Sequence, residues 1–373
     1  MDVLGNIYSI IVGTVLPFII VLTIVVFVHE MGHYLVGRWC GIRIVTFSIG
    51  FGRELAGFTD RNGTRWKLSA IPLGGYVKFF GDENAASFPD EDKIAEMSQA
   101  EQSQTFQGAS LGRRAATVAA GPIANFLLAI VIFTAVYSYF GKAVLDPVVA
   151  SVQPASAAAE AGLEPGDRIL EIDGRTIDSF DDLRIYVSTR PGVELRLIVE
   201  RDGRNKDFVL VPKRAEVDNG FGDMIEVGQI GVVASANEDT FRYEKMGPLE
   251  ALAEGVGQSF FIVSQTVQYF KNIIIGRAKP DQISGPIGIA KISGQMVSVG
   301  LVSTITFIAF ISVSIGFLNL LPIPILDGGH LLFYLIEFLR GKPVGERGQE
   351  FAFKIGLSLL LMLMIYATWN DVT

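Results

Sequence analysis

The stretch VVFVHEMGHYLV, residues 25–36, joins a long uncharged segment to two histidines and a glutamate. In an α-helix, positions i and i+4 share one face, so the imidazoles of His29 and His33 can reach one metal ion. Glu30 adjoins the first of these histidines and can take a proton from a metal-bound water. The pattern HExxH alone is equally compatible with polar side chains at a helix end that reach toward the membrane interface.

Four segments without a charged residue are the candidate membrane spans. They are residues 3–28, 115–141, 292–326 and 355–370. A bilayer core about 30 Å thick requires roughly 20 helical residues. The first three segments reach that length, and the fourth reaches it when residues 351–353 join it. The sequence therefore predicts four transmembrane helices, with HEMGH at the inner end of the first.

The composition supports a membrane protein and excludes several other classes. Of the 373 residues, 50% are hydrophobic and 19% are charged, against about 25% charged residues in an ordinary soluble protein. The 39 acidic residues outnumber the 31 basic ones, so the chain lacks the basic surface that a nucleic-acid partner requires. The single cysteine, Cys40, can form neither an internal disulfide nor a cysteine metal cluster. A fully soluble enzyme, a disordered chain and a nucleic-acid-binding protein are thereby excluded.

The distribution of lysine and arginine predicts the orientation in the membrane. Residues 38–114 hold ten of these side chains and residues 340–354 hold four, whereas the N-terminal tip and residues 371–373 hold none. Loops rich in basic residues stay on the cytoplasmic side, so both termini are expected on the outer side. The other 17 lie in residues 142–291, a long translocated region to which the rule does not apply. We expect a multi-pass protein of the inner (cytoplasmic) membrane with periplasmic termini.

A third metal ligand is expected after the longest uncharged segment. A catalytic zinc ion usually takes three protein ligands and one water. Asp327 follows NLLPIPIL, in which Pro322 and Pro324 stop a regular helix. Irregular backbone at membrane depth is tolerated only where it is buried in protein or lines a cavity. Gly328 and Gly329 allow close approach and unusual backbone angles. Asp327 and the two histidines should therefore meet near the cytoplasmic side.

Residues 142–215 predict a compact β-rich module on the outer side. Its run AGLEPGDRILEIDG, residues 161–174, resembles a PDZ domain. PDZ domains bind the end of an extended peptide by adding it as a strand to a sheet edge. The alternative is a rigid spacer whose groove binds nothing.

The remaining segments complete the expected fold. Residues 41–81 alternate apolar and polar positions and contain glycine-rich turns, which predicts membrane-associated β-hairpins. Residues 82–112 are polar and predict a flexible cytoplasmic loop. Residues 216–291 connect back to the membrane and include an amphipathic helix, either at the outer membrane surface or packed on the module.

The expected fold class is an α-helical polytopic membrane protein with four transmembrane helices, a membrane-associated β-hairpin region and an inserted PDZ-like α+β domain. The proposed boundaries are 1–40, 41–81, 82–112, 113–141, 142–215, 216–291, 292–340 and 341–373.

Motifs along nearly the whole chain together resemble the site-2 protease family, and most closely its bacterial branch of RseP-type regulators of sigma-E. In order, they are HEMGH (29–33), PLGGYVK (72–78), GPIAN (121–125), the PDZ-like run and NLLPIPILDGG (319–329). The chain differs from some relatives in having one PDZ-like module where they have two in tandem.

This resemblance implies roles for individual residues. It implies Zn²⁺ held by His29, His33 and Asp327, with Glu30 as the general base. It also implies that Asn319 binds or orients the substrate.

The same resemblance implies that the segment around Gly74 and Gly75 pairs with an unfolded strand of the substrate. The expected function is a zinc-dependent intramembrane endopeptidase that cleaves single-span membrane proteins, such as an anti-sigma factor or a signal-peptide remnant. The expected partners are that transmembrane substrate, a peptide end at the PDZ-like domain and the lipid bilayer.

Two other functions make different predictions. A non-enzymatic, membrane-tethered PDZ adaptor, whose metal site is structural or lost, predicts that function survives His29→Ala. A metal transporter would need polar groups through its spans, and these spans are nearly bare. His330 is either a neighbour of the metal site or a capping or interfacial histidine, and the second interpretation is preferred. Gly121 and Asn125 are interpreted as positions that allow close helix packing rather than as ligands.

Overall fold

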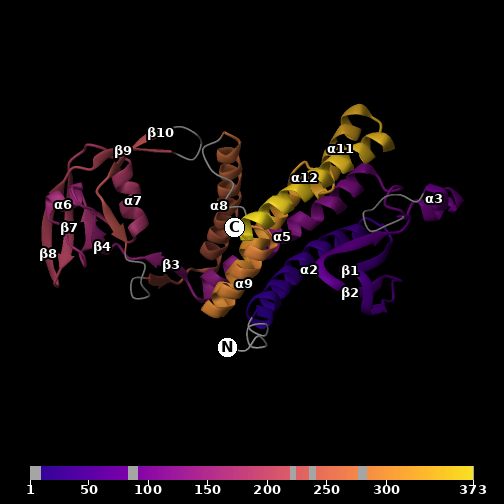
Figure 1. The fold of residues 1–373 in the computed structure, drawn as a ribbon, viewed down its shortest axis with the longest axis horizontal. Helices are drawn as coiled ribbons and strands as arrows, with labels where there is room; N and C mark the ends of the chain where they lie inside the picture. The colour runs from indigo at the N-terminus through magenta and orange to yellow at the C-terminus, as the bar shows by residue number, and fades with distance from the viewer. Residues whose placement is uncertain (1–9, 83–90, 219–223, 235–240, 276–283, 373) are drawn as a thin grey trace. The chain divides into compact units, whose positions relative to one another are not determined.

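The computed structural model describes residues 10–82, 91–218, 224–234, 241–275 and 284–372 (Figure 1). The chain forms two compact units. The membrane unit comprises residues 1–134, 252–266 and 279–373, and the second unit comprises residues 135–251 and 267–278.

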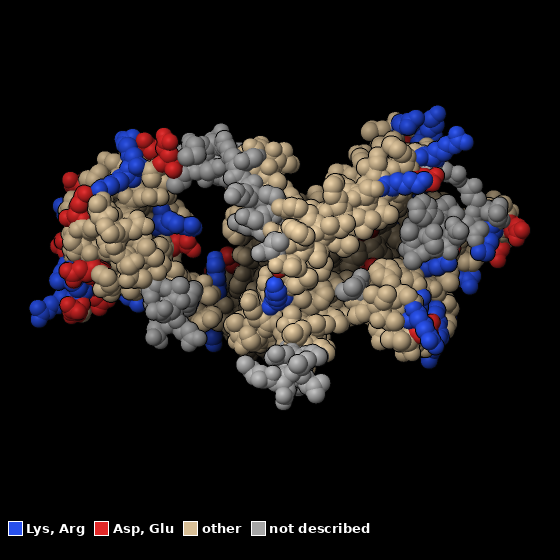
Figure 2. All heavy atoms as spheres, in the orientation of Figure 1, with Lys and Arg blue, Asp and Glu red and all other residues tan. Residues whose placement is uncertain are grey.

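Among the described residues, four helical segments are long and apolar enough to cross a bilayer. They are Ile11–Trp39, Leu111–Tyr139, Leu301–Leu320 and Arg347–Val372. The first combines η1 (Ile11–Val15) with α2 (Leu16–Trp39), and the others are α5 (Leu111–Tyr139), α10 (Leu301–Leu320) and most of α12 (Glu346–Val372). The visible surface of the helices carries few charged side chains (Figure 2). The prediction of four spans is confirmed, although residues 3–9 of the first predicted span lie outside the described residues.

The third uncharged segment, residues 292–326, does not form one helix. It divides into α9 (Pro286–Val299) and α10, and α11 (Asp327–Arg340) follows an irregular segment. The break falls at Gly300, whose φ of 140° is one that side-chain-bearing residues rarely adopt. Since glycine is also common inside membrane helices, an uncharged sequence does not reveal such a break.

Close backbone approach holds the membrane helices together. A Cβ atom at Gly32 of α2 would lie 2.3 Å from the carbonyl oxygen of Ala120 in α5. A Cβ at Gly316 of α10 would lie 3.1 Å from the carbonyl oxygen of Pro122 in the same helix α5. Small residues permit this packing where lipid provides no hydrophobic drive between helices. Helix α5 therefore contacts both α2 and α10.

The predicted β-hairpin region is formed by β1 (Ile44–Thr59) and β2 (Arg65–Phe79). The first part of β1 pairs with both ends of β2, since Thr46 lies opposite Lys78 and also opposite Arg65. The second part of β1 pairs only with residues 65–69. Residues 75–79 consequently form one edge of this small sheet.

The predicted flexible loop, residues 82–112, is partly helical. It contains α3 (Glu91–Glu96) and α4 (Gln99–Gln102), and a capping box between Ser98 and Glu101 starts α4. Phe106 stacks on Phe79 of β2 with the ring centroids 4.7 Å apart. The polar composition indicated a loop correctly for part of the segment, but one buried aromatic residue anchors it. Residues 83–90 lie outside the described residues.

The second unit contains the β-rich module, here residues 142–234. Its strands are β3 (Lys142–Leu145), β4 (Val149–Val152), β5 (Arg168–Ile172), β6 (Arg175–Thr176), β7 (Leu195–Arg201), β8 (Arg204–Leu210), β9 (Lys213–Asp218), β10 (Met224–Gln229) and β11 (Val232–Ala234). Its helices are α6 (Ala157–Ala161) and α7 (Phe180–Ser188). The main sheet has the order β6-β5-β7-β8, and smaller pairs join β9 to β10 and β4 to β11. After the module, β12 (Phe241–Glu244) returns to pair with β3.

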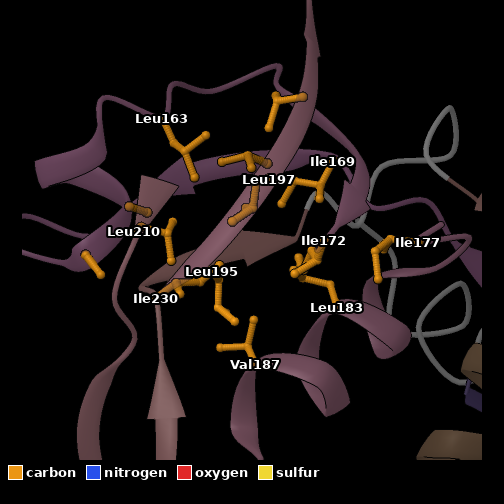
Figure 3. Packing of buried hydrophobic residues seen from close by; sticks show 14 residues of the cluster. Leu163, Ile169, Ile172, Ile177, Leu183, Val187, Leu195, Leu197, Leu210 and Ile230 are labelled. Atoms are coloured by element: carbon orange, nitrogen blue, oxygen red, sulfur yellow. The ribbon is translucent and has the colours of Figure 1, made fainter. Parts of the chain in front are cut away.

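The module has its own hydrophobic core, in which the labelled side chains point toward one another (Figure 3). Ile230 belongs to this core, and β11 pairs with β4. The structure thus extends the module past residue 215, where the sequence-based boundary stood. When a strand joins a sheet after a polar stretch of chain, the local sequence does not show which sheet it joins.

Helix α8 (Pro248–Ile274) forms within the region predicted to be an amphipathic helix. A Cβ at its Gly255 would lie 3.1 Å from Thr134 Oγ1 of α5, and Ser259, one turn later, is buried. The middle of α8 therefore packs against α5, which neither of the two predicted placements anticipated.

Candidate metal centre

Helix α2 carries both predicted histidine ligands on one face. The helix runs without a break from Leu16 to Trp39, so the HExxH motif lies inside it. His29 is 8% exposed, and the rings of His29 and His33 meet edge to face with their centroids 4.8 Å apart. This ring geometry directs the two Nε2 atoms into one small space.

The predicted third ligand enters the same space from the first residue of α11. Oδ2 of Asp327 lies 3.1 Å from Nε2 of His29 and 3.5 Å from Nε2 of His33. The two Nε2 atoms are 3.2 Å apart. Ligands at about 2.0–2.1 Å from a tetrahedral zinc ion lie roughly 3.3–3.4 Å from one another. The three atoms therefore have the separations that a tetrahedral ion requires.

The hydrogen bonding of this cluster also fits a cation. Oδ2 of Asp327 is buried and has no hydrogen-bond partner among the described residues. His33 Nδ1 lies 2.9 Å from the carbonyl oxygen of Thr117. A carbonyl only accepts, so this Nδ1 carries the hydrogen, and the lone pair of Nε2 points toward Asp327. Metal-binding histidines are commonly held through the other ring nitrogen in this way.

The loop before α11 fixes the position of Asp327 by close contact. A Cβ at Gly328 would lie 2.3 Å from the carbonyl oxygens of Leu320 and Leu321. Gly328 itself is helical, so close approach explains it, and the predicted unusual backbone angles do not occur there. They occur at Ile325, whose φ is 113°. A β-branched residue in this region stores about 1–3 kcal/mol of strain, which the surrounding contacts must offset.

Two residues of α5 belong to the centre, although the sequence analysis assigned them only to helix packing. A Cβ at Gly121 would lie 2.3 Å from His33 Nε2, so only glycine leaves room for the cluster. The amide nitrogen of Asn125 lies 3.2 Å from His29 Nδ1, and Asn125 is 0% exposed. The i, i+4 spacing within GPIAN placed both residues on one face of α5, which was the available signal.

A cavity of about 530 Å³ opens beside the cluster. Its lining includes Glu30, Asn319 and His330 together with apolar side chains such as Phe79 and Leu357. The backbone N–H of Val77, in the edge segment of β2, donates a hydrogen bond to the Glu30 carboxylate. Glu30 and Asn319 thus face the space next to the three candidate ligands.

The predicted glycines of the β2 edge occupy different positions. Gly75 lines the cavity, and a Cβ there would lie 2.9 Å from Cγ of Glu30. Gly74 is not part of that lining; its φ is 131°, and a Cβ there would lie 2.6 Å from the ring of Phe51. A positive φ within β2 and close approach to an aromatic ring account for Gly74, while Gly75 permits the strand to approach the glutamate.

His330 lies one turn after Asp327 and lines the cavity. Its ring centroid is 5.4 Å from that of Phe353 in α12. It is therefore part of the cavity wall, which the preferred interpretation as an interfacial or capping residue did not foresee.

Comparison with known proteins gives concordant matches. A family model described as Peptidase family M50 matches residues 17–363. A protein of Rhizobium meliloti (strain 1021), whose name describes it as a zinc metalloprotease, is 55% identical over 96% of both chains. Metalloprotease MmpA of Caulobacter vibrioides is 38% identical over 94% of this chain and 93% of its own.

Among solved structures, the PDZ domain of an SdrC-like protein from Listeria monocytogenes is 25% identical. It covers 26% of this chain and 88% of its own, with a TM-score of 0.19.

Proposed function

The chain belongs to peptidase family M50 and is a membrane-spanning zinc metalloprotease, and from this premise we propose that it cleaves the transmembrane segments of single-span membrane proteins. The observation that carries the proposal is the convergence of His29, His33 and Asp327 beside the carboxylate of Glu30, at the wall of a cavity.

In this proposal, His29, His33 and Asp327 hold the zinc ion. Zinc bound there would supply a Lewis acid and an acidified water. Glu30 accepts the proton of that water and later delivers it to the leaving amine. A hydrogen bond from the Val77 N–H holds the carboxylate beside the cluster.

The substrate must unwind before it can be cut, because the amides of a transmembrane helix are bonded internally. Each freed backbone group costs several kcal/mol in hydrocarbon. The edge formed by residues 75–79 can pair with the unwound segment by strand addition. Gly75 keeps this edge close to Glu30, and Asn319 faces the same cavity, where it can hold the substrate or its developing oxyanion.

The proposed setting is the inner membrane, with both termini and the β-rich module in the periplasm and the metal centre near the cytoplasmic side. The distribution of basic residues in the loops supports this orientation. An anti-sigma factor or a signal-peptide remnant fits as the substrate. A PDZ-like module outside the membrane would bind the free end of a peptide, which suits a protease that acts after an earlier outer-side cut.

The test compares native and Glu30→Gln protein in detergent, by zinc content and by cleavage of a model single-span substrate. The variant is expected to keep its zinc and to lose about 100-fold or more of its activity. Glu160→Gln, at an exposed carboxylate of α6, is the matched control and should behave as native. Full activity of Glu30→Gln would refute the assigned role. If the zinc-loaded native protein cleaves no membrane segment, and signalling in cells survives His29→Ala, the adaptor function is favoured.

A further inference from the structure

Asn125 is a fully buried polar side chain next to the candidate ligands. It is 0% exposed between α2 and α10, and a Cβ at Gly316 of α10 would lie 3.1 Å from its own Cβ. Its main-chain carbonyl accepts a hydrogen bond of 2.8 Å from Ser312 Oγ. Its side-chain amide lies against Nδ1 of His29 at 3.2 Å, and Oδ1 has no partner among the described residues. An amide at such a position has few orientations open to it.

The two orientations of this amide have opposite consequences for His29. If the amide nitrogen donates to Nδ1, the hydrogen of the neutral imidazole sits on Nε2 and points into the metal cluster. If the amide turns by half a rotation about its terminal torsion, Oδ1 faces Nδ1 and accepts its hydrogen. Only the second orientation leaves the lone pair of Nε2 free for a cation.

Helix α5 already provides the second arrangement for the other histidine. The carbonyl oxygen of Thr117 accepts from Nδ1 of His33. Thr117, Gly121 and Asn125 are four residues apart and therefore lie on one face of α5. Along this face, one residue accepts from His33, the next leaves space for the cluster, and the third contacts His29.

We infer that Asn125 is a positioning residue that holds His29 in the tautomer able to bind metal, by accepting the Nδ1 hydrogen through Oδ1. The inference rests on the proposed zinc site. It gives α5 a role that the motif GPIAN alone did not indicate, since this helix supplies no ligand yet orients both imidazoles.

The test uses the full-length protein in detergent and two readouts that do not depend on catalysis. One is zinc affinity, measured by competition with a chromophoric chelator, and the other is the visible spectrum of the Co²⁺-substituted protein. Asn125→Leu keeps the approximate size but removes the acceptor, and it should weaken zinc binding about 10–100-fold and alter the cobalt spectrum. Asn125→Asp can only accept, so it should bind zinc at least as tightly as native and keep the spectrum.

Ser312→Ala is the matched control, because it removes the neighbouring hydrogen bond to the backbone of Asn125 and leaves the side-chain amide in place. It should retain native affinity and spectrum. Native affinity and spectrum in Asn125→Leu would overturn the inference. Weakened zinc binding in Asn125→Asp would also overturn the inference, because it would show that the native amide acts as a donor to His29. This second variant keeps the inference testable even if Asn125→Leu does not fold. Retention of zinc by His29→Ala would instead refute the proposed site itself.

Discussion

The β-rich module and the metal centre bury side chains of opposite kinds. In the module, Leu195, Leu197 and Val199 on β7 are 0% exposed and belong to one hydrophobic core. At the metal centre, Thr117 and Asn125 are equally buried but polar. The first core is held by the removal of apolar surface from water, at about 25 cal/mol per Å². The second depends on hydrogen bonds and on helices that approach to backbone contact.

This difference predicts two kinds of response to substitution. An apolar core loses stability in proportion to the volume removed and the relaxation around it. A metal site loses its ion when a single extra atom enters it, because all three ligand distances must be satisfied at once for one ion to bind. The substitutions below test whether the two regions respond so differently.

Gly121→Ala should have the largest effect. The added Cβ would lie 2.3 Å from His33 Nε2, inside the space that the ion requires. Bound zinc should fall from about one ion per chain to nearly none, and cleavage should fall by about 100-fold or more. Metal analysis of the purified protein measures the first effect directly. Gly112→Ala, on the same helix with no atom within 4 Å of the new Cβ, is the control. Full zinc content in Gly121→Ala would show that the helices can separate without losing the site.

Leu197→Ala tests the other side of the comparison. Leu197 is 0% exposed at the centre of the module, so its truncation should lower the free energy of unfolding of the module by about 2–5 kcal/mol. Hydrogen exchange of the β5 and β7 amides in the full-length protein measures this loss. The zinc content should stay at the native level, because Leu197 packs within the module's own hydrophobic core.

Val209→Ala on the neighbouring strand β8 is the control for Leu197→Ala, since Val209 is 49% exposed. It should cost about 0.5 kcal/mol or less. A loss of zinc in Leu197→Ala would mean that the two regions fold as one cooperative unit.

Asp167 tests a buried ion pair of the module. Its side chain is 0% exposed and pairs with Arg201 at 2.6 Å. Burial disfavours the charged carboxylate, but hydrogen bonds from Arg201 and from the Glu164 N–H outweigh it and hold the pKa of Asp167 below its ordinary value. The ion pair therefore stabilises the module above the unfolded-state pKa, and this contribution is lost as the pH falls through the lower folded-state pKa.

Asp167→Asn should cost the module about 1.5–3 kcal/mol at pH 7 and remove part of its sensitivity to acid. Hydrogen exchange of the β5 amides between pH 7 and pH 3 measures both effects. Asp173→Asn, at a carboxylate in the exposed Asp173–Gly174 turn, is the control. If the acid sensitivity of the module is unchanged in Asp167→Asn, other titratable groups cause that sensitivity.

The sequence predicted the parts of the fold that hydrophobic patterns and charge determine. Uncharged segments identified the four spans, and alternation identified the hairpin of β1 and β2. The candidate ligands His29 and His33 share a helix face, so their approach to each other followed from spacing alone. Asp327 followed from the need for a third ligand. The structure brings all three atoms together.

The parts that the sequence could not predict depend on contacts between distant segments. The break at Gly300, the extension of the module to Ile230 and the packing of α8 on α5 are all tertiary effects. The places of Gly121 and Asn125 in the centre have the same origin. Each residue sits on a helix whose composition is typical of any membrane span, and only the neighbouring helix α2 gives the residue its role.

Loss of a helix cap should give the smallest effect on stability. One cap of the module is local in the sequence, whereas one cap of the membrane unit joins two distant helices. Ser179 of the module accepts a hydrogen bond from the N–H of Asp182, three residues away. The start of α9 is instead capped by Asp371 near the end of α12, which accepts from the N–H groups of Gly285 and Gly288 at 2.9 and 2.8 Å. Loss of either cap should cost about 0.5–2 kcal/mol.

The two losses should spread differently. Ser179→Ala should raise hydrogen exchange only in the first turn of α7, because its cap is local. Asp371→Ala should raise exchange at the start of α9 and also at the end of α12, since the carboxylate joins two helices 83 to 86 positions apart in the chain. Asp371→Asn, which keeps one acceptor oxygen, should fall between native and alanine. If exchange rises in α9 alone, α12 is held in place by its apolar contacts, and the long-range cap serves only the helix that it begins.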